Sequence, residues 1–196
     1  MISNIFKNYR IILASKSPRR QFLLKELGLD FEIIENPETG ETYPPNLPKE
    51  EIPVFLAEMK ASYAMPIIPE NTLLITADTI VWLNGKVINK PGGYTEAIKM
   101  LEELSGEVHE VLTGVCLSTN QKRHSFYTST LVYFAKLSKE EIKYYVEQYQ
   151  PYDKAGAYGI QEWIGYIGIE RIEGSYFNVM GLPVQELYRE MIKFLS

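Results

Sequence analysis

The chain has 196 residues, of which 45% are hydrophobic and 23% charged, a composition typical of a folded globular protein. Its net charge of −5 argues against a general nucleic-acid binder, because neutralising a phosphate backbone needs a basic surface. No apolar run approaches the roughly 20 residues that span a bilayer. The N-terminus shows no secretory cleavage site, and the single cysteine, Cys116, excludes an internal disulfide. We therefore expect a cytoplasmic protein that uses neither a membrane nor a nucleic-acid polymer as a partner.

The beginning of the chain predicts a buried strand followed by a helix. Ile11–Ala14 is the apolar run of the strand. Ser17 is suited to cap the helix, with Pro18 at the first helical position, and Gly28 ends it. The buried positions expected for this helix are Phe22, Leu23, Leu24 and Leu27.

The rest of the chain alternates strand and helix patterns. The expected strands are 31–34, 73–77 with its continuation 80–83, 87–88, 108–117, 125–135 and 169–172. In 108–117 and 125–135 apolar residues alternate with polar ones. The expected helices are 49–63, 94–104, 138–149 and 183–195, the third opened by a capping box of Ser138 and Glu141. Residues 36–48, with four prolines, predict an irregular loop. The order predicts a mixed α/β sheet in a single domain spanning residues 1–196.

A cluster of hydroxyls and arginines follows the first strand, in the segment Ser15-Lys16-Ser17-Pro18-Arg19-Arg20. A helix N-terminus attracts anions through its unpaired N–H groups and its dipole. Arginine adds paired hydrogen bonds to phosphate oxygens. The segment is therefore a candidate phosphate site, although an ordinary N-cap with two solvated arginines explains the same residues.

An acidic residue follows the apolar run 73–77, in the segment Ala77-Asp78-Thr79. A carboxylate at the end of a buried strand is costly unless it is paired, hydrogen-bonded or bound to a metal. Strand ends are also where ligands bind in open α/β sheets. Asp78 could hold a divalent cation and orient or deprotonate an attacking water; its alternative role is to cap the turn that follows.

Small residues surround an Asp-Lys pair in the segment 153–161, Asp-Lys-Ala-Gly-Ala-Tyr-Gly-Ile-Gln. Such residues let a ligand approach the backbone closely. The amide of Gln161 can both donate and accept, which suits the O4 and N3–H edge of thymine or uracil. The structural alternative is a packing corner in which Asp153 and Lys154 merely pair.

Three further residues carry weaker signals. Lys60 and Lys90, the latter held extended by the proline after it, could each contact a phosphate, but such lysines are usually solvated. His109 begins a strand, where a single histidine is more often a structural hydrogen-bonding group than a ligand.

Together, S-K-S-P-R-R at 15–20, A-D-T at 77–79, K-P at 90–91, L-S-G-x-x-H at 104–109 and D-K-A-G-A-Y-G-I-Q at 153–161 resemble the Maf family. The resemblance runs in order from Ile11 to Pro183. It implies an inosine-triphosphatase-like fold with two lobes around a deep central cleft. It also implies a homodimer that cleaves nucleoside triphosphates between the α- and β-phosphates with Mg²⁺ or Mn²⁺.

The resemblance also implies roles for individual residues. Asp78 matches the catalytic proton acceptor, and the substrate-selecting positions of the dTTP- and UTP-preferring branch match Arg19, Thr79 and Gln161. Phosphate-binding positions match Ser15, Arg20, Lys60, Lys90 and Lys154. Metal-binding positions match Asp78, Asp153 and an acid of the early loop, Glu41 or Glu38. Glu162 departs from the family pattern, in which a small residue is more usual.

The function implied is hydrolysis of dTTP and UTP to the monophosphate and pyrophosphate, removing unwanted or modified nucleotides. One alternative is the same fold acting on 7-methyl-GTP or another modified nucleotide. An alternative from a different class is a non-enzymatic inhibitor of septum formation that acts by binding proteins.

Overall fold

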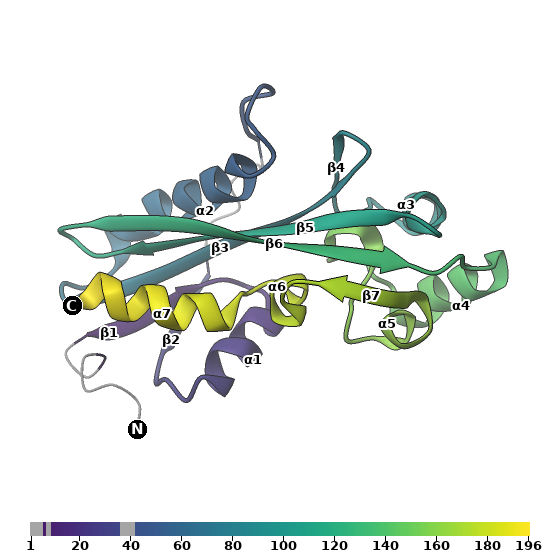
Figure 1. Ribbon diagram of the computed structural model, residues 1–196. Coiled ribbons are helices and arrows are strands. Elements are labelled where there is room, and N and C mark those ends of the chain that lie inside the picture. The colour runs from purple at the N-terminus through teal and green to yellow at the C-terminus, as the bar shows by residue number, and fades with distance from the viewer. Residues whose placement is uncertain (1–5, 7–8, 36–41) are drawn as a thin grey trace. The chain divides into compact units, whose positions relative to one another are not determined.

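The computed structural model describes residues 6, 9–35 and 42–196 (Figure 1). By chain contacts it divides into two compact units. The first contains residues 1–78, 113–128 and 181–196, and the second contains 79–112 and 129–180. Three strands, β3 (Thr72–Leu83), β5 (Val108–Ser118) and β6 (Arg123–Phe134), supply residues to both units.

The strands form one mixed sheet in the order β2-β1-β3-β5-β6-β7, with β4 paired to β3. β1 (Arg10–Ala14) is parallel to β2 (Glu32–Ile34) and to β3. β4 (Lys86–Ile88) returns antiparallel to β3, and β7 (Ile169–Glu173) is antiparallel to β6. The predicted mixed α/β class is thus confirmed.

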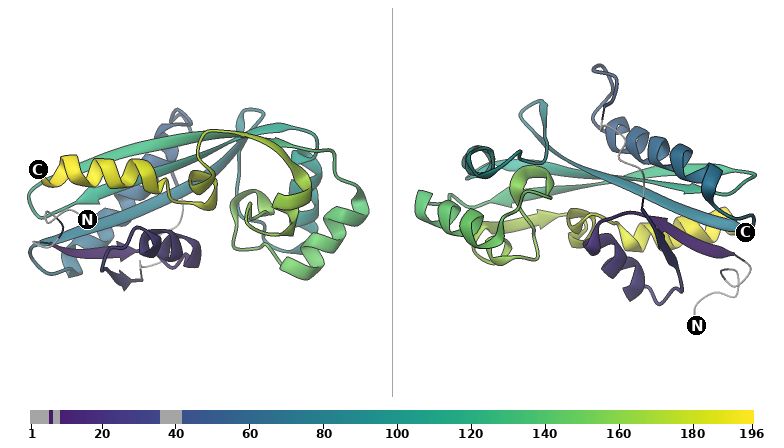
Figure 2. Two further views of the ribbon diagram at one scale, coloured as in Figure 1. Left: turned by 60° about the horizontal axis from the view of Figure 1, so that its bottom comes forward. Right: turned by 180° about the vertical axis from the view of Figure 1, so that it is seen from behind.

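Helices cover both faces of the sheet in the first unit. Helix α2 (Glu51–Ala64) lies on one face, and α1 (Pro18–Glu26) and α7 (Val184–Leu195) lie on the other (Figures 1 and 2). α2 packs through small side chains, which let its backbone approach the strands closely. The core on that face comprises Ile12, Ala14, Ala57, Ala61, Ala64, Leu74 and Cys116.

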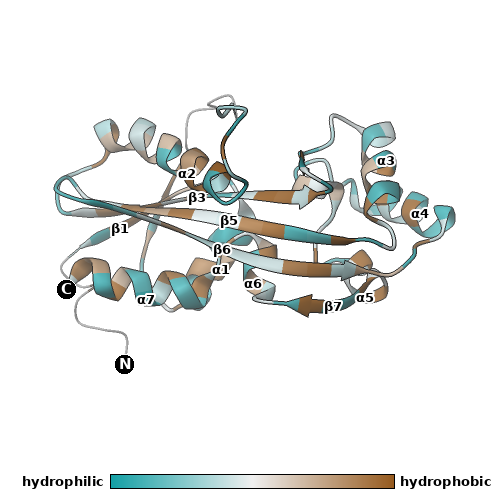
Figure 3. Ribbon diagram, turned by 45° about the horizontal axis from the view of Figure 1, so that its top comes forward, coloured by the Kyte–Doolittle hydropathy of each residue, from teal (hydrophilic) through white to brown (hydrophobic). Residues whose placement is uncertain are grey.

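The terminal helix α7 shows helical spacing of its buried residues. Its hydrophobic and hydrophilic residues are both visible in Figure 3. Those that turn inward are Val184, Leu187, Glu190, Met191 and Phe194. Glu190 is tolerated there because its carboxylate pairs with His124, at 2.7 Å, and with Lys193.

The second unit has its own apolar core, built on α3 (Tyr94–Leu104), α4 (Lys139–Tyr149) and the strand segments beside them. The Ser138–Glu141 capping box that opens α4 is confirmed. Short helices η3 (Ala155–Ala157), α5 (Trp163–Gly168) and α6 (Tyr176–Met180) complete the unit. A 3-10 turn, η2 (Met65–Ile67), belongs to the first unit. Among the described residues, no helix is both long and apolar enough to cross a membrane.

Most predicted elements are present, with four corrections. Phe22 is 55% exposed, so it does not belong to the buried side of α1. β5 is buried continuously from Val111 to Ser118 and not on alternate residues, because it lies between β3 and β6. Asp78 lies inside β3, which runs unbroken from Thr72 to Leu83, and not at a strand end. α5 and α6 were not predicted; α5 includes Gly165, where any Cβ would collide with the carbonyl of Ile160.

The seat of α2 on the sheet depends on Gly114 of β5. A Cβ at this position would overlap the backbone of Pro53 and Val54, in the first turn of α2. Backbone cannot yield as a flexible side chain can. We therefore predict that Gly114→Ala lowers the free energy of unfolding by about 1–3 kcal/mol, the usual cost of overpacking. Chemical denaturation would measure this loss.

The matched control is Gly93→Ala, because a Cβ at Gly93 has nothing within 4 Å and its backbone is extended. Its stability should stay within about 0.5 kcal/mol of that of the unchanged protein. Equal stability of the Gly114 and Gly93 variants would contradict the close approach of α2 to β5.

Candidate active site

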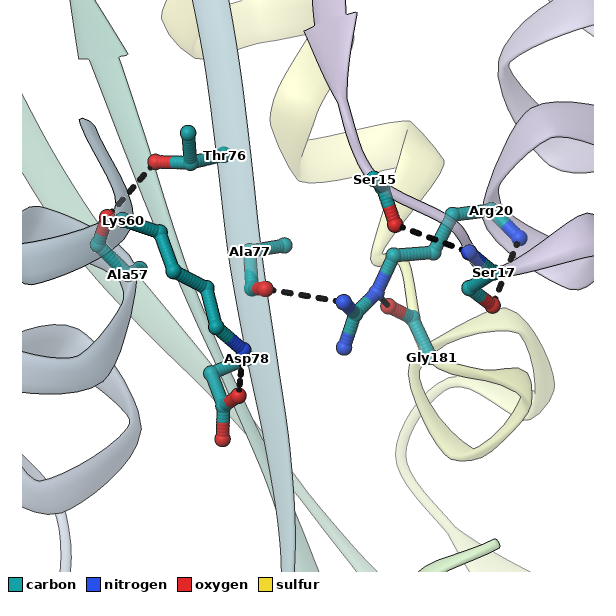
Figure 4. Close-up of polar contacts among 9 residues, drawn as sticks. All are labelled: Ser15, Ser17, Arg20, Ala57, Lys60, Thr76, Ala77, Asp78 and Gly181. Carbon is teal, nitrogen blue, oxygen red and sulfur yellow. Dashed lines mark hydrogen bonds and ion pairs between the residues drawn. The ribbon is translucent and has the colours of Figure 1, made fainter. Parts of the chain in front are cut away.

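The first unit places Asp78 beside Lys60 of α2 (Figure 4). Lys60 Nζ donates to Asp78 Oδ1, forming an ion pair. The side chain of Asp78 is 8% exposed and that of Lys60 is 16% exposed. A buried carboxylate needs such a partner, because the desolvation of an unpaired charge is prohibitive. Lys60, a weak candidate on sequence grounds, is therefore a direct partner of the strongest one.

Two neighbouring contacts hold α2 where Lys60 reaches Asp78. The hydroxyl of Thr76, which is fully buried, donates to the carbonyl oxygen of Ala57 at 2.7 Å. Ala57 lies three residues before Lys60, and Thr76 two residues before Asp78, so this bond ties helix to strand next to the ion pair (Figure 4). Thr76 is a positioning residue that the sequence did not reveal, because a threonine inside a strand is unremarkable.

Arg20 approaches β3 from the other side (Figure 4). Its Nη1 donates to the carbonyl of Ala77 and its Nε to the carbonyl of Gly181, both at 2.8 Å. The pairing of β1 with β3 ends at Leu13 and Ile75, so the Ala77 carbonyl lies beyond the paired stretch. Arg20 thus supplies a partner for that carbonyl and fixes its guanidinium next to the residue that precedes Asp78.

The turn from β1 into α1 is held by its own hydroxyls. Ser15 Oγ accepts from the backbone N–H of Ser17 at 3.2 Å, and Ser17 Oγ accepts from the N–H of Arg20 at 3.4 Å. The N-cap interpretation of Ser17 is confirmed. Arg19 is half-buried on the first turn of α1. Binding of phosphate at this helix N-terminus stays a prediction.

The second unit contains the segment 153–162, whose charged groups form a cluster. Lys154, 8% exposed, lies between Asp153 at 2.7 Å and Glu162 at 3.1 Å. Tyr145 donates its hydroxyl to Glu162 and accepts from the N–H of Gly159 at 3.0 Å. Burial, reinforced by the bond to Glu162, raises the pKa of Tyr145, so this phenol stays protonated. The pairing of Asp153 and Lys154 expected for a packing corner is present, and Glu162 joins it, while phosphate binding by Lys154 stays a prediction.

Other predicted residues of the second unit differ in burial. The amide oxygen of Gln161 is buried and has no hydrogen-bond partner among the described residues. Thr79 is half-buried on β3, and Lys90 is exposed after β4. An unpartnered acceptor is unusual, because more than nine in ten buried polar groups are hydrogen-bonded. Gln161 is thus suited to accept a hydrogen bond from a ligand.

The predicted metal ligands are only partly described. Glu41 and Glu38 lie outside the described residues. Asp153 has a side chain that is 57% exposed and pairs with Lys154. The part of the chain that the structure describes contains no cluster of three or more His, Cys, Asp or Glu side chains able to hold a metal ion. Asp78 is the buried carboxylate among the described candidate ligands. A single carboxylate suits Mg²⁺, because that ion is usually held by one or two carboxylates together with substrate phosphates.

Comparison with known proteins shows the family of the chain. The model of one family, described as Maf-like protein, matches residues 10–194. The chain belongs to the Maf family. A relative from Bacteroides fragilis named dTTP/UTP pyrophosphatase is 53% identical over 97% of this chain and 98% of its own. A Phocaeicola vulgatus relative of the same name is 55% identical over 98% of this chain and 100% of its own.

A solved structure supports the fold of this Maf protein. The Ham1 protein of Staphylococcus aureus has a TM-score of 0.52, with 16% identity over 94% of this chain and 99% of that one. At that identity the likeness shows the fold alone. It agrees with the mixed α/β class predicted for the Maf chain.

His109, part of the Maf resemblance, is buried among aromatic side chains. Its Nε2 lies 2.7 Å from the hydroxyl of Tyr158, and its ring packs against Phe134. Its Nδ1 is buried with no hydrogen-bond partner among the described residues. Protonation would bury a cation with one unpartnered N–H, and burial accordingly lowers the pKa of His109 to about 4.

This environment predicts a pH dependence of stability. Between about pH 6.5, the pKa of an exposed imidazole, and about 4, the unfolded chain binds a proton at His109 that the folded chain does not. The free energy of unfolding therefore falls as the pH falls through this window, by about 3 kcal/mol in total at about 1.4 kcal/mol per pKa unit. Denaturant titrations from pH 4 to 7 would measure it.

The control is His109→Gln, whose amide can bond to Tyr158 but does not titrate. The variant should lose stability less steeply than the unchanged protein over the same pH range. Identical slopes for the two proteins would show that His109 does not contribute.

Proposed function

We propose that this Maf protein is a nucleoside triphosphate pyrophosphatase that converts dTTP and UTP to the monophosphate and pyrophosphate. The observation that carries the proposal is the buried Asp78–Lys60 pair. It sits in a chain that shares more than half of its residues with relatives named dTTP/UTP pyrophosphatase. The full-length match to those relatives supports carrying over the reaction as well as the fold.

Asp78 would accept a proton from the attacking water and hold that water in line with the α-phosphorus. The ion pair with Lys60 limits the rotation of the carboxylate. Arg20, already oriented by two carbonyls, and the N-terminal turn of α1 provide positive potential for phosphate oxygens. Positioning and charge stabilisation supply most of the rate in such a reaction.

A divalent cation, Mg²⁺ or Mn²⁺, completes the proposed site. Asp78 would be one of its ligands, and Glu41 and Asp153 are the further ligands suggested by the family resemblance. When bound, the ion would neutralise triphosphate charge. Asp78, the buried carboxylate among the described candidate ligands, is compatible with an ion held largely by substrate and water.

Gln161 supports the choice of base. Its buried amide oxygen needs a donor, and the N3–H of thymine or uracil is one, whereas the N3 of cytosine is an acceptor. The half-buried side chains of Arg19 and Thr79 are the other proposed selecting residues. A homodimer and a cytoplasmic location belong to the same proposal.

We predict that Asp78→Asn lowers kcat for dTTP at least about a hundredfold, the usual contribution of a general base. Pyrophosphate release would be measured with saturating dTTP. Circular dichroism should show a folded variant, since asparagine matches aspartate in size.

The control is Glu190→Gln, which changes another buried, ion-paired acid of the same unit. Its activity should stay within about threefold of the unchanged protein, in line with a role confined to structure. An active Asp78→Asn variant would refute the assignment. Cell-division arrest that survives Asp78→Asn would instead favour the protein-binding alternative.

The substrate panel forms a separate prediction. With Mg²⁺ or Mn²⁺, dTTP and UTP should release pyrophosphate faster than CTP, GTP and 7-methyl-GTP, and a chelator should abolish release. Each rate is measured as kcat/KM under identical metal concentration. Preference for 7-methyl-GTP would favour the second branch of the family, and full activity in excess chelator would exclude the metal.

A further inference from the structure

The carboxylate of Glu162 contacts two other groups at once, one inside the 153–162 segment and one outside it. One carboxylate oxygen pairs with Lys154 at 3.1 Å, and the other accepts from the Tyr145 hydroxyl. Its side chain is 19% exposed, against 57% for Asp153, the other partner of Lys154. Asp153 is the closer partner, at 2.7 Å, but water screens that exposed pair more than it screens the pair with Glu162.

The backbone of the segment is tied to the same carboxylate. Tyr145 accepts from the N–H of Gly159, and the N–H of Glu162 donates to the carbonyl of Gly159 at 2.9 Å. A Cβ at Gly159 would lie 2.8 Å from the carboxylate carbon of Glu162, so the glycine makes room for this acid. Gly159 and Glu162 bracket Gln161, whose amide oxygen is buried without a partner.

Tyr145 comes from outside the segment. It lies on α4, is fully buried and stacks on Tyr149 with ring centroids 5.1 Å apart. Because Tyr145 is packed on α4, its hydroxyl donates to Glu162 from a fixed position. The hydroxyl of Tyr145 thus ties the segment to α4.

We propose that Glu162 is a positioning residue for substrate binding, which holds Lys154 and, through Tyr145 and Gly159, the backbone that carries Gln161. The proposal rests on the function proposed above. It explains how a glutamate is accommodated at this position. Glu162 folds back onto its own segment, and Gly159 leaves the space.

The test separates bonding from charge. Glu162→Gln keeps one acceptor oxygen, which can serve Tyr145 or Lys154 but not both, and loses the charge. Glu162→Ala loses both bonds, and Tyr145→Phe loses only the hydroxyl that joins Glu162 to Gly159. We expect KM for dTTP and UTP to rise at least about tenfold in Glu162→Ala, equivalent to about 1.4 kcal/mol of binding. Tyr145→Phe should change KM in the same direction, and kcat should stay within about threefold in both.

Two further results are expected. Glu162→Gln, which keeps one of the two acceptors, should give a KM between that of Glu162→Ala and that of the unchanged protein. The double variant Glu162→Ala/Tyr145→Phe should be no worse than the poorer single variant, because both act through one chain of bonds. Thermal unfolding is recorded for every variant, and KM is measured well below the lowest Tm. A residue that only stabilises the fold would lower Tm and leave KM unchanged, and that outcome would overturn the proposal.

The unchanged protein, assayed in parallel, distinguishes the two proposals. If it hydrolyses dTTP and Glu162→Ala keeps its KM, the positioning role is wrong and the proposed function stands. If it hydrolyses neither dTTP nor UTP, the proposed function fails. Calorimetric binding of dTTP with an α,β-imido linkage then tests the variants without catalysis, and equal Kd for Glu162→Ala and the unchanged protein would overturn the role of Glu162.

Discussion

Asp78 carries its charge inside a strand in which nearly every residue is buried, and the arrangement of the first unit follows from this constraint. The carboxylate requires a cation, and α2 must lie where Lys60 can provide one. The hydroxyl of Thr76 and the missing side chain of Gly114 give α2 that position, one by a bond and the other by leaving space. A helix seated a few tenths of an ångström higher would leave a buried charge poorly paired.

The turn between β1 and α1 depends on the same strand. Because β1 stops pairing two residues before Ala77, β3 presents a carbonyl that no strand bonds on that side, and Arg20 supplies the donor. A lysine could not reproduce this contact together with the one to Gly181, since both use the geometry of one guanidinium. The arginine predicted as a phosphate ligand is therefore also a structural connector, and its orientation is set before any substrate arrives.

Local signals in the sequence predicted the elements and most of the candidate residues. Ser17 with Pro18 and the Ser138 capping box located helix starts because capping is a short-range effect. The partnership of Lys60 with Asp78 was not predictable, because it depends on long-range packing of a helix on a strand. Two short helices were missed for a related reason. In α5, Gly165 avoids a collision that any Cβ would make with the carbonyl of Ile160, and helix propensities contain no information about such a contact.

Lys60 and Lys154 differ in a way that bears on how the protein can bind a polyphosphate. Among the described residues, Lys60 pairs with Asp78, whereas Lys154 contacts both Asp153 and Glu162. Carboxylates therefore hold both ammonium groups in place and offset part of their charge. The arginines, the N-terminus of α1 and a bound cation would add to the positive potential that a triphosphate requires. Under the proposed function a bound cation is useful because carboxylates already offset part of the charge of Lys60 and Lys154.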